Sequence, residues 1–108
     1  MKYEKINSIS INEFEKALKN VPLKELPLTL LSILNCDDYA YIQETYLKYI
    51  NHQDTWVSKT AINGLSDLAR IHKVDKEKVI TSLNTLKNHD SQLIDIIDDC
   101  IDDINYYG

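Results

Sequence analysis

Five aspartates near the carboxyl end of the chain have a spacing that would place their carboxylates on one side of a helix. They are Asp95, Asp98, Asp99, Asp102 and Asp103. Residues three, four, seven and eight positions apart share a helical face, so these side chains would form one stripe. With Asp90, residues 88–108 hold six acids and no base, while residues 1–87 hold all 12 Lys+Arg and 11 Asp+Glu. The net charge of −5 therefore comes from this terminal segment.

A carboxylate stripe could bind a metal ion, carry out acid–base catalysis or bind a cationic partner. Calcium requires several oxygen ligands wrapped around it by a loop, and a straight helix presents its carboxylates on a convex surface. Hydrolysis by paired carboxylates requires a concave site with two different environments. The stripe therefore predicts an unrelieved anionic face that serves as a docking surface for a basic protein, with no metal and no cofactor. The alternative is an ordinary solvated face of an acidic protein.

Other chemistry finds little support in the sequence. The histidines, His52, His72 and His89, lie at expected turns or helix ends, without the spacing of a zinc site. A glycine-rich phosphate loop is excluded because the chain has two glycines, Gly64 and Gly108. No nucleophile, base and acid occur in a supportive pattern. The prediction is that the protein is not an enzyme; a deep pocket holding His or paired acids would revive that hypothesis.

The two cysteines, Cys36 and Cys100, are 64 positions apart and have no CxxC neighbour. Apolar and acidic residues surround both in the sequence, which favours buried packing and a raised thiol pKa over reactivity. A disulfide between them stays open as an alternative. One bridge would not make this chain a disulfide scaffold.

The acidic charge argues against nucleic-acid binding, because phosphate contacts need clustered Lys and Arg. The first ten residues lack the apolar stretch of a signal peptide. The longest apolar run, LPLTLLSIL, is too short and too broken to span a bilayer. The expectation is one soluble, cytoplasmic domain over residues 1–108, with neither nucleic acid nor membrane as a partner.

Leu and Ile at helical spacing, with few Gly and Pro, predict an all-α protein. A capping box from Ser10 to Glu13 and a cap at Asp54 mark two helix starts. The six expected helices span about 10–20, 27–35, 37–50, 54–71, 75–87 and 90–106. Expected inward residues of the first five are Phe14, Ala17, Leu18, Ala40, Ile42, Tyr46, Leu47, Tyr49, Ile50, Val57, Ala61, Leu65, Leu68, Val79, Ile80, Leu83 and Leu86. Leu93, Ile94, Ile97, Cys100, Ile101 and Ile104 form the apolar face of the last.

Aromatic residues add candidates for a binding surface. Tyr39, Tyr41, Tyr46 and Tyr49 crowd one expected helix, and four tyrosines cannot all face its core. Tyr106 and Tyr107 directly follow the acidic helix and could flank the aspartates as aromatic contacts. Trp56 lies off the apolar stripe of its helix; burial is expected there, and a partner-binding role is the alternative. The predicted partner-binding residues are Asp95, Asp98, Asp99, Asp102, Asp103, Tyr106, Tyr107 and Trp56.

A shift of 36 residues carries the fourth expected helix onto the sixth. Asp54 meets Asp90, and apolar positions such as Val57 and Leu68 meet Leu93 and Ile104. Recurrence at such a period indicates stacked helix pairs that share a core. Residues 38–104, with Asp54-x-x-Val57-x-x-x-Ala61-Ile62-x-x-Leu65, resemble HEAT-like repeats. The resemblance implies a short stack of antiparallel helix pairs; the alternative is an irregular helical bundle.

This chain departs from the repeat pattern in three respects. Ser58 stands where an Arg often follows the Val, the repeat starts have no Pro, and residues 1–36 match poorly. In size, charge and fold type the chain also resembles immunity proteins of bacterial contact-dependent and polymorphic toxin systems. That resemblance implies inhibition of a basic toxin domain, such as a nuclease, whose cationic active site the acidic helix would cover. The alternative is a HEAT-like adaptor or regulatory module whose acidic last helix is a polar cap.

Overall fold

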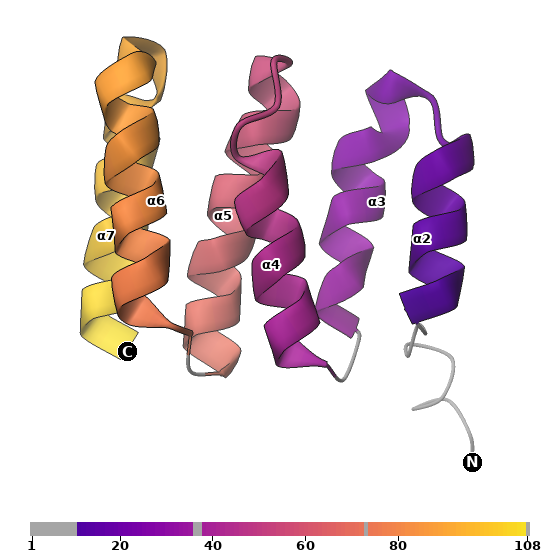
Figure 1. The fold of residues 1–108 in the computed structure, drawn as a ribbon, viewed down its shortest axis with the longest axis horizontal. Coiled ribbons are helices and arrows are strands. Elements are labelled where there is room, and N and C mark those ends of the chain that lie inside the picture. Colours follow the sequence, from indigo (N-terminus) through magenta and orange to yellow (C-terminus); the bar gives the residue numbers. More distant parts are fainter. Residues whose placement is uncertain (1–10, 36–37, 73, 108) are drawn as a thin grey trace.

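The computed structural model describes residues 11–35, 38–72 and 74–107, and within them all regular structure is helical (Figure 1). The α-helices are α2 (Ile11–Asn20), α3 (Leu26–Ser32), α4 (Tyr39–Tyr49), α5 (Thr55–Ile71), α6 (Lys76–His89) and α7 (Ile94–Tyr107). Short 3-10 helices span Leu23–Glu25, Ile33–Asn35 and Ser91–Leu93. The predicted all-α class and the six expected helices are confirmed.

Aspartate side chains cap the starts of α4, α5 and α6, and the cap predicted at Asp54 is confirmed. Asp54 accepts hydrogen bonds from the backbone N–H groups of Trp56 and Val57. Asp38 and Asp75 each accept from the N–H group three residues on, at the starts of α4 and α6. These carboxylates satisfy N–H groups that have no partner within the helix. The predicted capping box at Ser10 lies outside the described residues.

The boundaries of the second and the sixth expected helices differ from the predicted ones. The second helix begins at Leu26, after a 3-10 turn, and its expected last turn, Ile33–Asn35, is also 3-10. The sixth begins as a 3-10 turn capped by Asp90, and α7 starts only at Ile94. Both differences occur at helix ends, where chains commonly tighten to satisfy terminal backbone groups.

The helices form two layers, α2, α4 and α6 in front and α3, α5 and α7 behind (Figure 1). Helix α5 is central, because it packs against α3, α4 and α7. The Cys100 thiol donates to the Ile62 carbonyl, 3.3 Å away, and Arg70 pairs with Asp103 further along. On both helices the second contact lies further toward the carboxyl end than the first, so α5 and α7 run parallel and side by side. No helix of the described part is long and apolar enough to cross a membrane.

The buried core follows the predicted stripes with two corrections. Ala17 and Ala40 are exposed, although the sequence predicted both as inward. Ala40 and the buried Ile42 lie two positions apart, on nearly opposite sides of α4, so one core cannot cover both. On α2, an end helix, the covered face is narrow and Ala17 falls beyond it. Leu18, Tyr49 and Ile80 are half-buried at the edge of the core.

A tyrosine of α4 joins three helices. The Tyr46 ring lies directly on the backbone of Gly64 in α5, where a Cβ atom would come within 2.6 Å of ring carbons. Its hydroxyl donates a 2.9 Å hydrogen bond to the Leu30 carbonyl near the end of α3. That carbonyl lies in the last turn of α3 and also accepts from the Ile33 backbone N–H, so the tyrosine is its second donor. Burial raises the pKa of Tyr46, so the phenol stays neutral and keeps this bond.

Cys100 is buried between α5 and α7 and is a free thiol, as the sequence predicts. Burial raises the pKa of this thiol to about 11, from 9.0 for an unperturbed group. The predicted packing role and raised pKa are therefore confirmed for Cys100. Cys36 lies outside the described residues.

The raised thiol pKa predicts a loss of stability in alkali. Between pH 9 and pH 11 the unfolded chain ionises its Cys100 thiol while the folded chain keeps it protonated, so folding loses free energy as pH rises. In a Cys36→Ser background, the free energy of unfolding should fall across this window by about 1–3 kcal/mol more than in the same background with Cys100→Ala. Urea unfolding at several pH values measures the difference. Identical pH profiles would contradict the prediction.

Candidate partner-binding surface

The outer surface of α7 carries a row of acids opposite its buried face. Asp95, Asp99 and Asp102 are exposed, and no hydrogen bond or ion pair joins their side chains to any described residue. Together they form what we call the acidic crest. The buried residues Ile97, Cys100 and Ile104 lie on the other side of the helix. Burial of this apolar face against α5 and α6 fixes the direction in which the crest points.

The two remaining aspartates of the stripe are neutralised by neighbouring helices. Lys87 of α6 donates to Asp98 at 2.6 Å, and Arg70 of α5 donates to Asp103 at 3.2 Å. Arg70 also pairs with Asp67 on its own helix, at 3.2 Å. The sequence predicted an unrelieved anionic face, and this was wrong for these two positions. They lie on the sides of the stripe, where the adjacent helices bring bases alongside, so within the stripe the crest aspartates are the ones without an ion pair to any described residue.

The two terminal tyrosines extend the crest toward the carboxyl end of α7. Tyr106 lies four residues after Asp102, on the same helical face, and is 82% exposed. Tyr107 is 49% exposed and meets Tyr106 edge to face, with ring centroids 4.8 Å apart. The Arg70 guanidinium lies 5.8 Å from the centre of the Tyr107 ring. Such a contact restrains Tyr107 and leaves Tyr106 open to solvent.

Trp56 is 69% exposed, so the expectation that it is buried was wrong. It lies in the first turn of α5, one position before the buried Val57 and therefore about 100° around the helix. It borders a hollow of about 570 Å³ lined by Pro22, Leu23, Lys24, Pro27, Asp54 and Trp56. Since α5 and α7 run parallel, Trp56 and Tyr106 lie at opposite ends of the layer. The structure does not bring Trp56 together with the crest.

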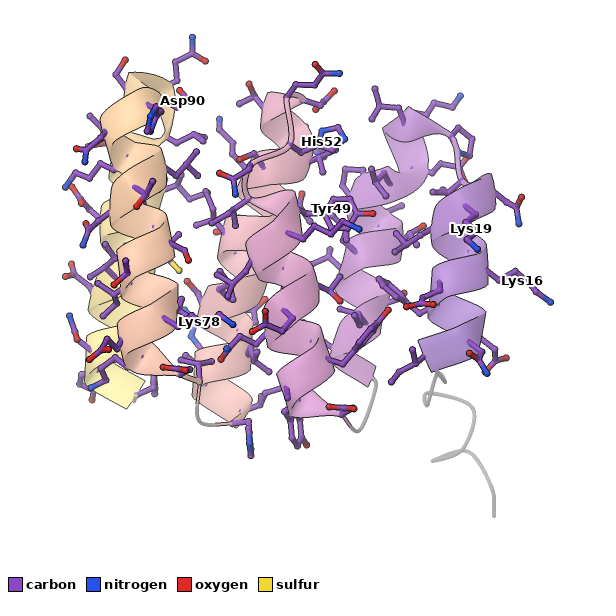
Figure 2. The ribbon with its side chains drawn as sticks, in the orientation of Figure 1. Lys16, Lys19, Tyr49, His52, Lys78 and Asp90 are labelled. Carbon is purple, nitrogen blue, oxygen red and sulfur yellow. The ribbon has the colours of Figure 1, made fainter. Side chains whose placement is uncertain are left out.

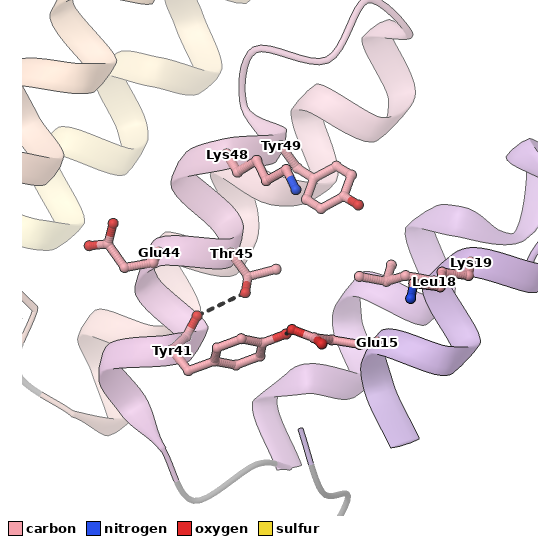
Figure 3. A pocket seen from close by; sticks show the side chains of 8 residues that line it. All are labelled: Glu15, Leu18, Lys19, Tyr41, Glu44, Thr45, Lys48 and Tyr49. Atoms are coloured by element: carbon pink, nitrogen blue, oxygen red, sulfur yellow. Dashed lines mark hydrogen bonds between the residues drawn. The ribbon is translucent and has the colours of Figure 1, made fainter. Parts of the chain in front are cut away.

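The four tyrosines of α4 have three kinds of environment. Tyr46 is in the core, Tyr41 and Tyr49 are half-buried, and Tyr39 is the most exposed, stacked on His72 at 4.0 Å. Tyr41 and Tyr49 line a groove between α2 and α4 (Figure 3). The sequence did not predict this groove, because its walls come from two helices and no local sequence pattern indicates that these helices lie side by side. The crowding of tyrosines was the available signal.

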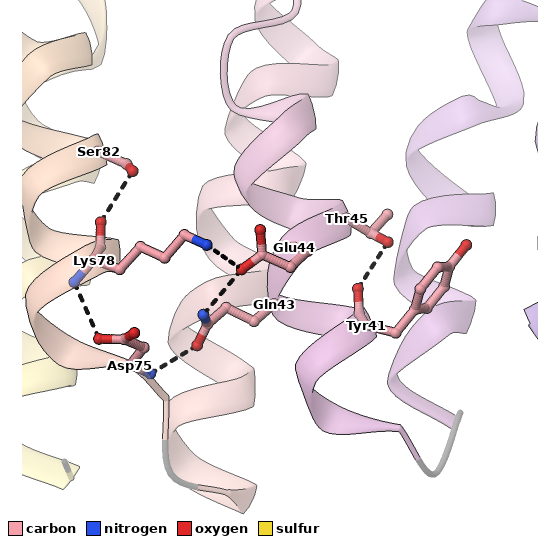
Figure 4. Close-up of polar contacts among 7 residues, drawn as sticks. All are labelled: Tyr41, Gln43, Glu44, Thr45, Asp75, Lys78 and Ser82. Carbon is pink, nitrogen blue, oxygen red and sulfur yellow. Dashed lines mark hydrogen bonds and ion pairs between the residues drawn. The ribbon is translucent and has the colours of Figure 1, made fainter.

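A polar cluster ties α4 to the start of α6 (Figure 4). The Gln43 amide oxygen accepts from the Asp75 backbone N–H at 2.7 Å, and Lys78 donates to Glu44 at 2.8 Å. The hydrogen bond from Lys78 lowers the pKa of Glu44, and the same bond raises the pKa of Lys78. Gln43 is itself buried, so its contact fixes the connection that leads into α6.

Comparison with known proteins finds no relative for this chain. No family model, no curated protein and no solved structure matches it. Within the described ranges, no three His, Cys, Asp or Glu side chains are grouped as a metal site would require. The inference about function therefore rests on the surfaces of the molecule itself.

Proposed function

We propose that this protein is a binding module that inhibits a basic partner protein, in the manner of an immunity protein that covers the cationic active site of a toxin domain such as a nuclease. The observation that carries the proposal is the acidic crest. It offers three exposed carboxylates on one helix, none of them paired with a base among the described residues, with an exposed tyrosine at its end. Helices α5 and α6 pack on the opposite face of α7, so α7 presents the crest without reorganisation.

The physical basis is electrostatic attraction followed by contact with an aromatic anchor. A concentrated negative surface accelerates encounter with a positive one, and the effect weakens as salt screens it. Tyr106 adds a rigid amphipathic ring of the kind that carries binding energy at interfaces. Asp98 and Asp103 contribute less, because Lys87 and Arg70 already satisfy them.

The second candidate is an adaptor or regulatory module in which α7 serves as a polar cap. Exposed apolar side chains at the opposite end of the layer favour it. Trp56, Leu23 and Leu28 are 69%, 54% and 71% exposed, and large exposed apolar side chains commonly mark protein contacts. On this hypothesis the partner binds near Trp56 and the crest contributes only solubility.

A capture experiment separates the two candidates. The purified protein, Asp99→Asn/Asp102→Asn and the charge-matched control Glu25→Gln/Glu77→Gln are each used to capture partners from the native source at low and high salt. Glu25 and Glu77 are exposed acids outside α7. A basic protein held at low salt by the wild type and the control, with affinity for the crest variant lower by about tenfold or more, supports inhibition through the crest. Equal capture by all three proteins points to the adaptor.

The same crest variant should fold at least as stably as the wild type. Asp99→Asn/Asp102→Asn removes repulsion from Asp95, Asp98 and Asp103, and each like-charge pair one turn apart costs roughly 0.2–0.5 kcal/mol. The free energy of unfolding in urea should stay level or rise by about 1 kcal/mol at low salt. In contrast, Asp98→Asn/Asp103→Asn breaks two ion pairs and should show no gain. A marked fall for the crest variant would mean that these acids hold the fold.

A further inference from the structure

The groove between α2 and α4 is a second surface with the features of a binding site. It encloses about 410 Å³. Its apolar and aromatic lining comes from Leu18, Tyr41, Thr45 and Tyr49, and its charged lining from Glu15, Lys19, Glu44 and Lys48 (Figure 3). Helix α2 packs mainly on α3, and α4 mainly on α5, so these two front helices stand apart and leave the groove open.

The acids of the groove already have partners within the protein. Glu15 accepts a 2.8 Å hydrogen bond from the Tyr41 hydroxyl across the groove. Glu44 accepts from the Lys78 ammonium at 2.8 Å and from the Gln43 amide at 3.4 Å. Lys78 neutralises Glu44, whereas Glu15, whose partner is a neutral hydroxyl, keeps its negative charge at the Tyr41 end of the groove.

The bases of the groove have no such partners. Among the described residues, no carboxylate lies within ion-pair distance of Lys19 or Lys48. The Lys48 ammonium lies 5.8 Å from the centre of the Tyr49 ring, a weak contact for an exposed charge. Lys16, on α2 one turn before Lys19, points outward from the far side of α2, away from α4, and does not line the groove (Figure 2). Among the described residues, Lys19 and Lys48 therefore supply the positive charge of the groove that has no ion-pair partner.

The dimensions favour a short peptide segment. From Tyr41 to Tyr49 the wall spans eight helical rises of α4, about 12 Å. This length accommodates about three or four residues of an extended chain. Glu15 opposes an anion at the Tyr41 end, so the negative charge of a ligand belongs between Lys19 and Lys48. Tyr49 and half-buried Leu18 offer an apolar surface beside that position.

We propose that this groove binds a short acidic segment of a partner protein, in which an Asp or Glu stands beside an aromatic or aliphatic side chain. The carboxylate would pair with Lys19 and Lys48, and the apolar side chain would pack on Tyr49 and Leu18. Charge complementarity is the basis for choosing this occupant. The groove and the acidic crest lie on different helices and attract opposite charges, so the protein could hold an acidic and a basic partner together.

The test uses acetylated, amidated tetrapeptides that each contain two acidic residues and one Tyr or Leu. They are titrated into the isotopically labelled protein up to millimolar concentration, and amide NMR shifts of Leu18, Lys19, Lys48 and Tyr49 report binding. The expected result is a saturable shift at these residues with at least one peptide and none with its Asn/Gln counterpart. Lys19→Glu/Lys48→Glu should weaken binding by about tenfold or more.

Matched variants make the outcome decisive. Lys24→Glu/Lys59→Glu changes the net charge equally at exposed lysines outside α2 and α4, and should bind as the wild type does. Lys19→Gln/Lys48→Gln removes the charges without adding acids and should also bind poorly. The proposal is overturned if no peptide shifts these residues, if the control variant loses binding equally, or if 4-hydroxyphenylacetate binds as tightly as the peptides. The last result would indicate a site for small anions.

Discussion

Gly64→Ala should lower the free energy of unfolding by about 2 kcal/mol, although alanine is the better helix former. The new methyl group would come within 2.6 Å of ring carbons of Tyr46, a distance that no packed structure tolerates. The ring must move, and its hydrogen bond to the Leu30 carbonyl would lengthen or break. Overpacking and the lost bond outweigh a gain in helix propensity of about 1 kcal/mol. Urea unfolding of the variant and the wild type measures the difference.

Two comparisons identify the cause of that loss. Asn63→Ala changes the adjacent exposed residue of α5 and should leave stability level or slightly higher. Tyr46→Leu removes the ring, so adding Gly64→Ala to this variant should cost much less than in the wild type. If Gly64→Ala proves as stable as the wild type, the packing of Tyr46 on Gly64 is not the contact that joins these helices.

Phe14→Ala should have the largest effect on a single helix, a loss of about 3 kcal/mol. Among the ten described residues of α2, Phe14 alone is fully buried, and its ring meets Tyr41 edge to face at 6.3 Å. Without this ring, α2 has only half-buried side chains to hold it on α3. We therefore expect the NMR signals of α2 to broaden or move to random-coil positions, while the signals of α5 stay in place.

The urea transition and the groove both report on this change. The free energy of unfolding should fall, and the acidic peptides should no longer bind, because one wall of the groove is lost. Asn12→Ala, at an exposed position of the same helix, serves as the control and should leave both measurements unchanged. A Phe14→Ala protein that keeps an ordered α2 would show that other contacts dock this helix.

The helices could be predicted from the sequence because their signals are local. Asp54 caps the N–H groups two and three residues ahead, and such a contact can be predicted from a few neighbouring residues. The apolar spacing of α5 likewise predicts its buried face. The pairing of Asp98 with Lys87 could not be predicted, since it depends on how α6 and α7 are rotated about their axes. The exposure of Trp56 could not be predicted for a similar reason, because it depends on where the neighbouring α3 begins.

The candidate sites divide in the same way. The crest is a feature of one helix, so the spacing of its aspartates predicts it without any knowledge of the fold. The groove combines Lys19 from one helix with Lys48 and Tyr49 from another, and only the packing of both on the back layer brings them together. A search of one sequence for motifs finds the first kind of surface and misses the second.

The central position of α5 sets an order in which the molecule opens. Helix α5 has neighbours on three sides, whereas α2 lies at the end of the stack. Amide hydrogens of α5 should therefore exchange with solvent only on global unfolding, and those of α2 through local opening. One wall of the groove is α4, which packs on the central helix α5, and the other wall is α2 at the end of the stack. A ligand that contacts both walls would favour the docked position of α2 and slow the exchange of its amide hydrogens. Ligand binding and the docking of α2 are therefore thermodynamically coupled.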